Sequence, residues 1–427
     1  MRVLVLSQTY MPEPNDIRIH SLAAGLVMRG HEVVSVAPYP SYPTGRIYPE
    51  YKQKIYEWEV IDGVKILRVP VSPDHRNSKR ARAKMYASFM ASATIMGTML
   101  GGKADAIWAY QPPLTIAIPA LTLKQFKRAP LMYHIDDLWP ENMRQAGLPE
   151  GHFLYRGLDR LANHVYRKAD FFTVQSPGMR QALIEEKGVH EARVETIPTW
   201  ADEDVYRQDE PDAEFGHING LHNKFNIVWT GNIGNFQALD VVLRCARRLK
   251  ELPDVQFVFV GEGVQAEPLR EQAEAMNLTN VVFKGLRPKS EMPQFLAWAG
   301  ASLVHLEKNP LFEITIPGKT YGYMAAGRPI LCGVEGNAAD LIEGAGCGLT
   351  FESENDLQMS ECILQLLNMS SEHRLQMGER GRQLFLQRFT KAASIQKTAE
   401  ILERLGQRKL ESSRRGQETV GSQALPR

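Results

Sequence analysis

The sequence has 427 residues, more than a single hydrophobic core normally holds, and so predicts two domains. Apolar residues make up 44% of the chain and charged residues 23%, a composition typical of globular proteins. The formal net charge of +1 provides no overall field for nucleic acid, so we expect no nucleic-acid partner. Any phosphate binding therefore has to come from local groups.

The cysteines and the first residues favour a cytoplasmic protein. The cysteines are Cys245, Cys332, Cys347 and Cys362. No two of them form a CxxC pair, so we expect reduced thiols rather than a disulfide framework or a zinc site. The chain begins directly with an apolar strand, without the basic start and small-residue cleavage site of a signal peptide.

The first half alternates predicted strands and helices. A strand at Val3–Ser7 leads into a helix near Ile17–Arg29, and a second strand follows at His31–Ala37. Five further strands are predicted at Val64–Val69, Ala106–Tyr110, Leu131–Ile135, Phe171–Gln175 and Arg193–Ile197. Such alternation indicates a parallel sheet covered by helices on both faces, and we assign residues 1–200 to a first domain.

A basic cluster precedes an apolar stretch in this domain. The stretch Met85–Leu100 contains Gly, Ser and Thr, so it falls short of a membrane span. The cluster consists of Arg76, Lys79, Arg80, Arg82 and Lys84. Cations beside an apolar helix suit reversible docking on an anionic membrane surface. The alternative is that this stretch simply covers the first sheet.

The alternation restarts after a polar segment at 201–223, which we interpret as a linker. Six more strands are predicted at Asn226–Thr230, Gln256–Val260, Val281–Lys284, Ser302–Leu306, Pro329–Cys332 and Gly348–Phe351. These define a second α/β domain at 224–388. A helix at 389–406 is predicted to pack back on the first domain, and the polar tail 407–427 to stay disordered because it has little apolar surface to bury.

The ordered motifs of the chain resemble glycosyltransferase family 4. They are Pro12-Glu13-Pro14 with Ile17-Arg18, Tyr42-Pro43-Thr44-Gly45, Ile61-Asp62-Gly63-Val64, Asp137-Leu138-Trp139-Pro140-Glu141, Thr230-Gly231-Asn232-Ile233-Gly234, Val260-Gly261-Glu262-Gly263, Ile316-Pro317-Gly318-Lys319 and Tyr323-Met324-Ala325-Ala326-Gly327-Arg328-Pro329. Within the family they resemble bacterial surface-polysaccharide enzymes that transfer fucosamine-type or fucose-type sugars.

The resemblance implies an α/β protein of GT-B fold, in which two Rossmann-like, doubly wound domains face a central cleft. It implies a nucleotide-sugar donor, with UDP preferred, in the second domain. It also implies a lipid-diphosphate-linked glycan acceptor at the first domain, transfer with retention at the anomeric carbon, and attachment at the inner face of the plasma membrane. We expect no cofactor and no metal, because the sequence has no His cluster with ligand spacing.

In the second domain, Gly231, Asn232 and Gly234 follow a strand and precede a helix. Glycines allow the backbone to approach a diphosphate, although a tight turn without a ligand has the same pattern. Many family members carry an Arg directly after this first glycine and a Lys five residues later, where this chain has Asn232 and Gln237. We expect Lys319 and Arg287 to replace these charges, since both lie at strand–helix turns of this domain.

Other donor-site positions rest on the resemblance. Thr320, next to Lys319, is assigned to the nucleotide, and Glu262 resembles a family loop near the nucleotide, although it can equally be a turn residue. The family carries two Glu residues eight positions apart, which here align with Ile314 and Gly322. We expect Glu313 to serve in place of the first, by a shift of one residue.

In the first domain, His134, Asp136 and Asp137 end an apolar strand, and strand ends of this kind face the ligand in doubly wound folds. We expect them in the active site, with a helix cap as the alternative role of Asp137. Arg18 can hold a phosphate of the donor or the acceptor, or form a structural salt bridge. Asn15 and Tyr42 are assigned to the substrate by resemblance.

Two other functions fit parts of the pattern. A GT-B epimerase of a UDP-amino sugar would use cleft carboxylates and need no acceptor. A non-catalytic GT-B scaffold would explain the replaced residues at Asn232, Gln237 and Gly322. Sugar transfer accounts for the largest share of the motifs.

Overall fold

The structure is a computed structural model that describes residues 1–13, 17–42, 44–73, 78–145, 147–203 and 205–421. The chain divides into two compact units. Unit 1 comprises Met1–Gln175, Met179–Ile197 and Ser394–Arg427, and unit 2 comprises Ser176–Gly178 and Pro198–Ala393. Each unit is built on its own sheet.

Unit 1 contains an eight-stranded sheet in the order β3-β4-β2-β1-β5-β6-β7-β8. The strands are β1 (Arg2–Ser7), β2 (Glu32–Pro38), β3 (Glu57–Ile61), β4 (Val64–Val69), β5 (Ala106–Gln111), β6 (Leu131–Ile135), β7 (Phe171–Val174) and β8 (Val194–Thr196). Neighbouring strands are parallel except β3, which pairs antiparallel with β4. The sequence analysis missed β3, although Asp62 and Gly63 have the positive φ values of a tight hairpin turn.

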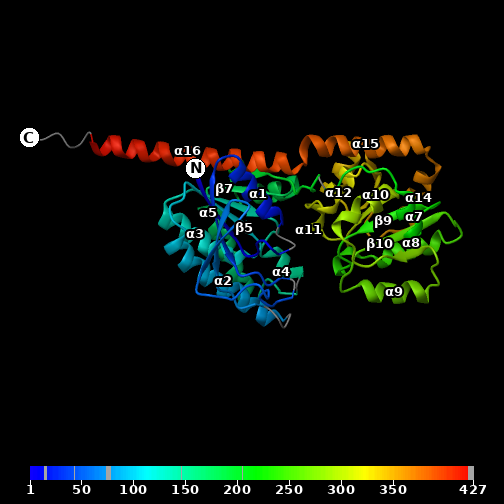
Figure 1. Cartoon of the computed structure of the whole chain (residues 1–427), viewed down its shortest axis with the longest axis horizontal. Helices are drawn as coiled ribbons and strands as arrows, with labels where there is room; N and C mark the ends of the chain where they lie inside the picture. Colours follow the sequence, from blue (N-terminus) through cyan, green and yellow to red (C-terminus); the bar gives the residue numbers. More distant parts are fainter. Residues whose placement is uncertain (14–16, 43, 74–77, 146, 204, 422–427) are drawn as a thin grey trace, which may run out of the picture. The chain divides into compact units, whose positions relative to one another are not determined.

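Helices cover both faces of this sheet. They are α1 (Ile17–Met28), α2 (Lys79–Leu100), α3 (Ala117–Lys127), α4 (Glu141–Gln145), α5 (Phe153–Lys168) and α6 (Pro177–Glu185), with 3-10 turns at Leu114–Ile116 and Glu191–Arg193. Figure 1 shows α2 and α3 on one side of the sheet and α1 on the other, and α2 packs along α3. No described helix is long and apolar enough to cross a membrane.

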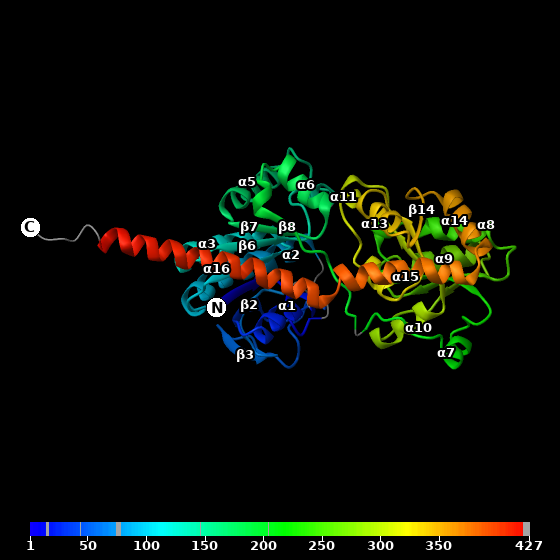
Figure 2. The same cartoon turned by 90° about the horizontal axis from the view of Figure 1, so that it is seen from above.

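The C-terminal helix α16 (Lys391–Gly421) starts in unit 2 and continues along unit 1, as seen from above in Figure 2. His31 contacts Glu403 at 2.9 Å, and the side chain of Ile395 fills the space beside Gly25. The predicted disordered tail from 407 is wrong as far as Gly421. Each residue added to a helix that is already held by packing gains a backbone hydrogen bond, and the Leu, Glu, Arg and Gln residues here favour helix.

Unit 2 contains a six-stranded parallel sheet in the order β11-β10-β9-β12-β13-β14. Its strands are β9 (Phe225–Thr230), β10 (Val255–Val260), β11 (Val281–Phe283), β12 (Ala299–His305), β13 (Ile330–Gly333) and β14 (Gly348–Thr350). The strand order reverses between β9 and β12. In doubly wound sheets, ligands bind at the carboxyl ends of the strands at this point.

The helices of unit 2 enclose two apolar clusters. They are α7 (Ala213–Ile218), α8 (Asp240–Arg248), α9 (Ala266–Ala275), α10 (Met292–Ala297), α11 (Pro310–Glu313), α12 (Lys319–Ala325), α13 (Asn337–Ala345), α14 (Asp356–Asn368) and α15 (Ser371–Arg388), with 3-10 turns at Asn235–Gln237 and Lys289–Glu291. Helix α7 lies inside the predicted linker. It forms because Asp212 caps its first turn, accepting from the backbone N–H of Phe215 at 2.7 Å.

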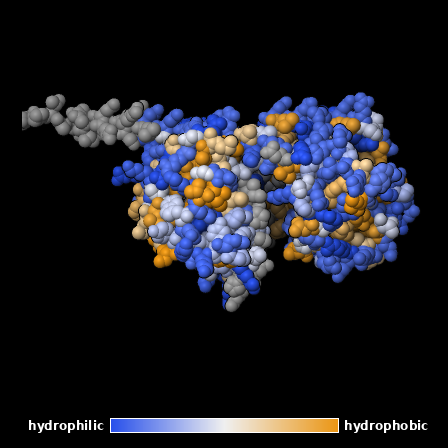
Figure 3. All heavy atoms as spheres, viewed as in Figure 1, coloured by the Kyte–Doolittle hydropathy of each residue, from blue (hydrophilic) through white to orange (hydrophobic). Residues whose placement is uncertain are grey.

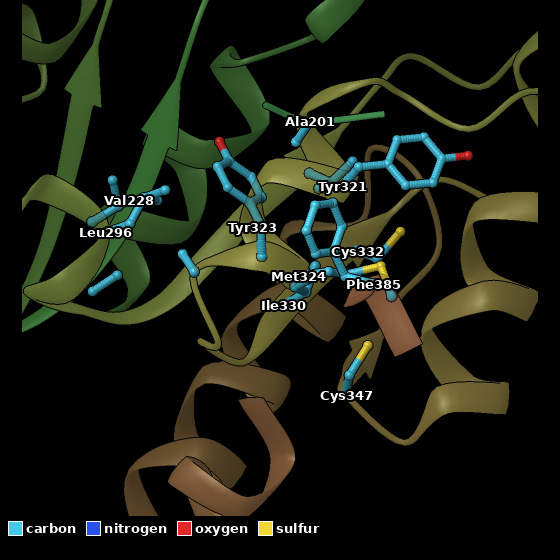
Figure 4. Close-up of a cluster of buried hydrophobic side chains, with 14 of the residues drawn as sticks. Ala201, Val228, Leu296, Tyr321, Tyr323, Met324, Ile330, Cys332, Cys347 and Phe385 are labelled. Carbon is cyan, nitrogen blue, oxygen red and sulfur yellow. The ribbon is translucent and has the colours of Figure 1, made fainter. Parts of the chain in front are cut away.

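Helix α12 is buried from Thr320 to Ala325 and packs beside the carboxyl end of β9. Figure 4 shows Tyr321 and Tyr323 extending from this helix to different sides, with Met324 and Phe385 between them. The Tyr323 hydroxyl accepts a hydrogen bond from the backbone N–H of Thr230 at 2.8 Å. The core therefore fixes the end of β9 relative to α12.

Candidate functional site

The loops that follow β9 and β10 pack against each other through glycines. Gly231 has a φ of +117° and Gly261 a φ of +147°, backbone values that residues other than glycine rarely adopt. A Cβ atom on Gly261 would lie only 1.9 Å from the carbonyl oxygen of Gly231. The predicted phosphate loop thus has an exposed backbone held in place by the neighbouring loop.

Gln237 closes this loop from the other end. Its side-chain oxygen accepts the backbone N–H of Gly234 at 2.9 Å, so the residue that replaces the family's Lys has a structural bond here. Its carbonyl accepts from Nδ1 of His305 at 2.8 Å, and Nε2 of His305 accepts from the Glu354 N–H at 3.0 Å. Burial lowers the pKa of His305, which matches a neutral ring with one donor and one acceptor.

Lys319 places an amine beside the loop. Its Nζ lies 2.9 Å from the centroid of the Trp229 ring, and a Cβ on Gly231 would be 3.7 Å from the same nitrogen. Nζ is buried and has no hydrogen-bond partner among the described residues. The hydroxyl of Thr320, the next residue, is also buried without a partner among them. The Lys319 amine and the Thr320 hydroxyl, in the first turn of α12, are therefore both left without a partner among the described residues.

The other predicted donor-site residues have partners within unit 2. Glu262 pairs with Arg270, while Arg287 donates to the carbonyl of Lys284 at 3.0 Å and lies 3.8 Å from Glu291. Asn232 is exposed at the edge of the loop. These assignments stay predictions, because an ion pair at the surface can exchange for a ligand.

The structure shows what surrounds Gly322 and Glu313, the residues discussed above for the two Glu positions of the family. A Cβ on Gly322 would lie 3.0 Å from the ring of Tyr206, so the tyrosine fills the space that a glutamate side chain would need. Glu313 ends α11, and its carbonyl oxygen would lie 2.2 Å from a Cβ on Gly336. The backbone around Glu313 is thus tightly packed, and its role in ribose binding stays a prediction.

In unit 1, the carboxyl end of β6 forms a polar network. Nε2 of His134 contacts Asp136 at 3.0 Å, and its Nδ1 contacts the hydroxyl of Thr173 at 2.9 Å. Tyr110 donates to Asp136 and stacks on His134 with ring centroids 4.6 Å apart. Burial raises the pKa of Asp136, but the hydrogen bond and charge of His134, the charge of Arg18 and the hydrogen bond from Tyr110 lower it by more. The net pKa of Asp136 therefore lies below its ordinary value.

Asp137 behaves differently from its neighbour. Its side chain reaches the surface, yet desolvation by the surrounding protein, followed by repulsion from Asp136, raises its pKa to about 6. Its carbonyl accepts from Nε2 of Gln111 at 2.7 Å, which fixes the backbone. Raised carboxyl pKa values at strand ends are typical of functional sites.

The loops after β1 and β2 are tied together by Glu13. This buried carboxylate accepts from the backbone N–H groups of Ser41 at 2.5 Å and Tyr42 at 2.7 Å. Tyr42 itself is exposed, as a substrate-binding role requires. Asn15 lies outside the described residues.

Sequence reasoning missed several residues at the candidate edge of unit 2. His305 ends a predicted strand, so the rule that selected His134 would also have found it. Trp229 and Tyr206 carry no such signal, because a buried ring in a strand or a loop is normally core. Among the described residues no group of His, Cys, Asp or Glu side chains is placed to hold a metal ion.

Comparison with known proteins assigns the family. Residues 16–200 match the Glycosyl transferase 4-like domain, and residues 224–369 match the Glycosyl transferases group 1 family. The chain belongs to glycosyltransferase family 4. The resemblance seen in the motifs is thereby confirmed, and the protein is a glycosyltransferase.

Two curated relatives resemble this glycosyltransferase over most of its length. The probable glycosyltransferase WbjE of Pseudomonas aeruginosa is 26% identical over 340 residues, covering 78% of this chain and 82% of the relative. The putative colanic acid biosynthesis glycosyl transferase WcaI of Escherichia coli K12 is 27% identical over 344 residues, covering 77% and 82%.

Solved structures establish the GT-B fold of this glycosyltransferase. HepE of Anabaena, in complex with UDP and glucose, matches with a TM-score of 0.70 at 16% identity, over 94% of this chain and 99% of HepE. WaaG, a glycosyltransferase involved in lipopolysaccharide biosynthesis, matches with a TM-score of 0.65 at 17% identity, over 94% and 99%. The predicted architecture of two doubly wound α/β domains is confirmed.

Proposed function

We propose that this glycosyltransferase moves a sugar from a UDP-sugar to a lipid-diphosphate-linked acceptor in bacterial surface-glycan synthesis, with retention at the anomeric carbon. The observation that carries the proposal is the buried amine of Lys319 beside the Gly231 loop, which has no hydrogen-bond partner in the part of the chain that the structure describes. A diphosphate offers the acceptor oxygens that Nζ and the Thr320 hydroxyl require. Gly231 lets the phosphates approach the backbone closely.

The relatives support the choice of uridine and of surface glycans. HepE has been crystallised with UDP and with UDP-glucose, and WcaI is named for colanic acid biosynthesis. In the proposed reaction, the bond between the anomeric carbon and the diphosphate oxygen breaks. The acceptor oxygen then bonds to that carbon on the same face, and its proton passes to the leaving diphosphate. This route needs no protein base on the opposite face.

The edge of β6 supports the acceptor part of the proposal. Asp136 is an ionised carboxylate held by His134 and Tyr110, and the positive charge of Arg18 acts on it. A guanidinium near this edge suits the diphosphate of a lipid-linked acceptor. Asp137, with its raised pKa, can accept a hydrogen bond from a sugar hydroxyl in its ionised form or donate one when protonated.

The proposal is tested by calorimetry with UDP and GDP. We expect UDP to bind more tightly than GDP, and Lys319→Ala to weaken UDP binding by about 1.5–3 kcal/mol because a charge-assisted phosphate contact is lost. The matched control is Lys250→Ala, since Lys250 is exposed, pairs with Glu251 and lies between α8 and the start of β10, at the amino ends of the strands. Equal affinity for both nucleotides would reject the base preference. An unchanged affinity in Lys319→Ala would remove Lys319 from the site.

We further propose that α2 and α3 dock the enzyme on an anionic membrane. Neither helix contains an acidic residue, while Arg80, Arg82 and Lys84 are present in the first two turns of α2. Met99 of α2 and Phe126 of α3 are 72% and 68% exposed. Hydrophobic residues also lie at the surface of unit 1 in the region of these helices (Figure 3). Phe89 and Ala93 point into the core, so the same helix covers the sheet.

Vesicle sedimentation tests this surface. We expect binding to anionic vesicles at low salt and partial release at high salt, because charges are screened beyond about 8–10 Å at physiological ionic strength. Replacing Arg80, Arg82 and Lys84 by Ser should reduce vesicle binding and leave UDP affinity unchanged. Replacing Lys250, Lys289 and Lys308 of unit 2 by Ser is the control. If both triple variants bound vesicles as the parent does, α2 would be an ordinary solvated face.

A further inference from the structure

The environment of Lys319 disfavours a charged side chain. Nζ is buried, lies over the ring of Trp229 at 2.9 Å and has no hydrogen-bond partner among the described residues. The indole face attracts an ammonium, but this attraction is the only compensation that the described residues offer it. Removing an ammonium from water without a partner costs more than that, so the neutral amine is favoured.

Charged groups around α12 are engaged elsewhere. From β12, His305 is bonded on both ring nitrogens, and from α15, Arg382 donates to the carbonyl of Ala325 at 2.6 Å, at the far end of α12. Further titratable groups lie on the neighbouring elements and loops of unit 2. Arg380 of α15 donates to the carbonyl of Gly346 at 2.8 Å, and the Cys332 thiol of β13 donates to the carbonyl of Val334. The others are Glu262, which pairs with Arg270, Arg287, which lies near Glu291, and Glu313 of α11. Burial is the one cause that lowers the pKa of Lys319 well below its ordinary value.

We propose that binding of a nucleoside diphosphate to unit 2 takes up a proton, which Lys319 receives as its amine moves from the face of Trp229 to a phosphate oxygen. The inference rests on the proposed function and adds a protonation step to it. In the free protein the side chain is a neutral amine that the indole accommodates. In the complex it becomes an ammonium paired with an anion, because the phosphate supplies the counter-charge that the protein does not.

The consequence is an affinity that falls as pH rises. A binding step coupled to uptake of one proton loses up to tenfold in affinity per pH unit once the free amine is deprotonated. The terminal phosphate of UDP ionises near pH 6, and the uracil imide loses its proton only in strongly alkaline solution. Between about pH 7.5 and pH 8.5 the charge of the ligand is therefore nearly constant, and proton uptake on binding belongs to the protein. Without the Lys319 step, affinity would be flat over this range.

The experiment is isothermal titration of the full-length protein with UDP at about pH 7.5 and about pH 8.5. Each titration is repeated in two buffers of different ionisation enthalpy, and the difference in heat gives the number of protons taken up. We expect uptake approaching about one proton per UDP at the higher pH and a Kd that rises up to about tenfold between the two pH values. Heats that do not depend on the buffer would overturn the inference.

Three variants assign the proton. Lys319→Arg stays charged, so it should bind UDP without proton uptake, and Lys319→Met should bind weakly and also without uptake. The control is Lys284→Met, because burial and then Arg287 lower the pKa of Lys284 as well. We expect its uptake to equal that of the parent. Uptake that persists in both Lys319 variants, or vanishes in Lys284→Met, would overturn the assignment. A parent that bound no UDP would reject the proposed function itself.

Discussion

The two sheet edges treat their charged groups in opposite ways. At the end of β6 in unit 1, Asp136 is bonded to His134 and Tyr110. Beside β9 in unit 2, the amine of Lys319 is buried and unpaired among the described residues. An edge whose charge is already satisfied is rigid before a ligand arrives. An edge whose buried polar group has no protein partner gains one only when a ligand binds. The mutations below test this difference between the two edges, from the largest expected effect to the smallest.

The largest effect is expected where unit 2 depends on glycine. In Gly261→Ala, the added Cβ would lie 1.9 Å from the carbonyl of Gly231, and the φ of +147° would be strained. We expect the free energy of unfolding in urea to fall by about 2–4 kcal/mol, with loss of UDP binding. Gly344→Ala is the control, since a Cβ there would meet no atom of the described residues within 4 Å apart from its chain neighbours and the backbone of its own helix. A Gly261→Ala protein as stable as the parent would mean that the two loops can separate freely.

A smaller effect is expected from opening the network of unit 1. Tyr110→Phe removes the donor to Asp136 and keeps the ring that stacks on His134. We expect a loss of about 1.5–3 kcal/mol in stability at pH 7, because the lost bond is to a charged group. The pKa of Asp136 is lowered, so this stabilisation is present above the ordinary value of 3.8 and disappears as pH falls through the folded value.

Urea unfolding of parent and Tyr110→Phe from pH 3 to pH 7 measures this difference. The control is Tyr56→Phe, whose side chain is 46% exposed. A difference that did not shrink on acidification would show that the hydroxyl of Tyr110 acts through something other than the Asp136 carboxylate.

The smallest effect concerns Asp137, whose pKa is raised from 3.8 to about 6. A raised carboxyl pKa means that the folded state holds its proton more tightly, so the folded protein loses stability as pH rises through the window from about 4 to about 6. Asp137→Asn should remove this loss and be more stable than the parent at pH 7. We expect only about 0.5–1 kcal/mol, since the side chain is exposed and solvent screens it.

Thermal or urea unfolding at pH 4 and pH 7 checks the Asp137 prediction. The advantage of Asp137→Asn should be small at pH 4 and reach its full size by pH 7. An advantage of the same size at both pH values would show that the pKa of Asp137 is ordinary in the folded protein.

Much of the architecture could be read from periodicity. The strands Arg2–Ser7 and Leu131–Ile135 form where mainly apolar runs end at polar residues, because a strand buried on both faces needs a nearly continuous apolar run. The hairpin strand Glu57–Ile61 was missed because two of its five residues are exposed and none is buried. The helix at 407–421 was missed because its composition is polar.

The sequence by itself determined the fold class, through its apolar periodicity, and the family, through motifs that resemble glycosyltransferase family 4. It also determined which polar residues end the strands at the two sheet edges. Only the tertiary structure decided what the polar residues at those edges do. Gln237 bonds to Gly234, Tyr206 fills the space beside Gly322, and Trp229 contacts the amine of Lys319. The reason is physical: the charge state and bonding of a side chain depend on neighbours that are distant in the chain, and the sequence does not state which neighbours these are.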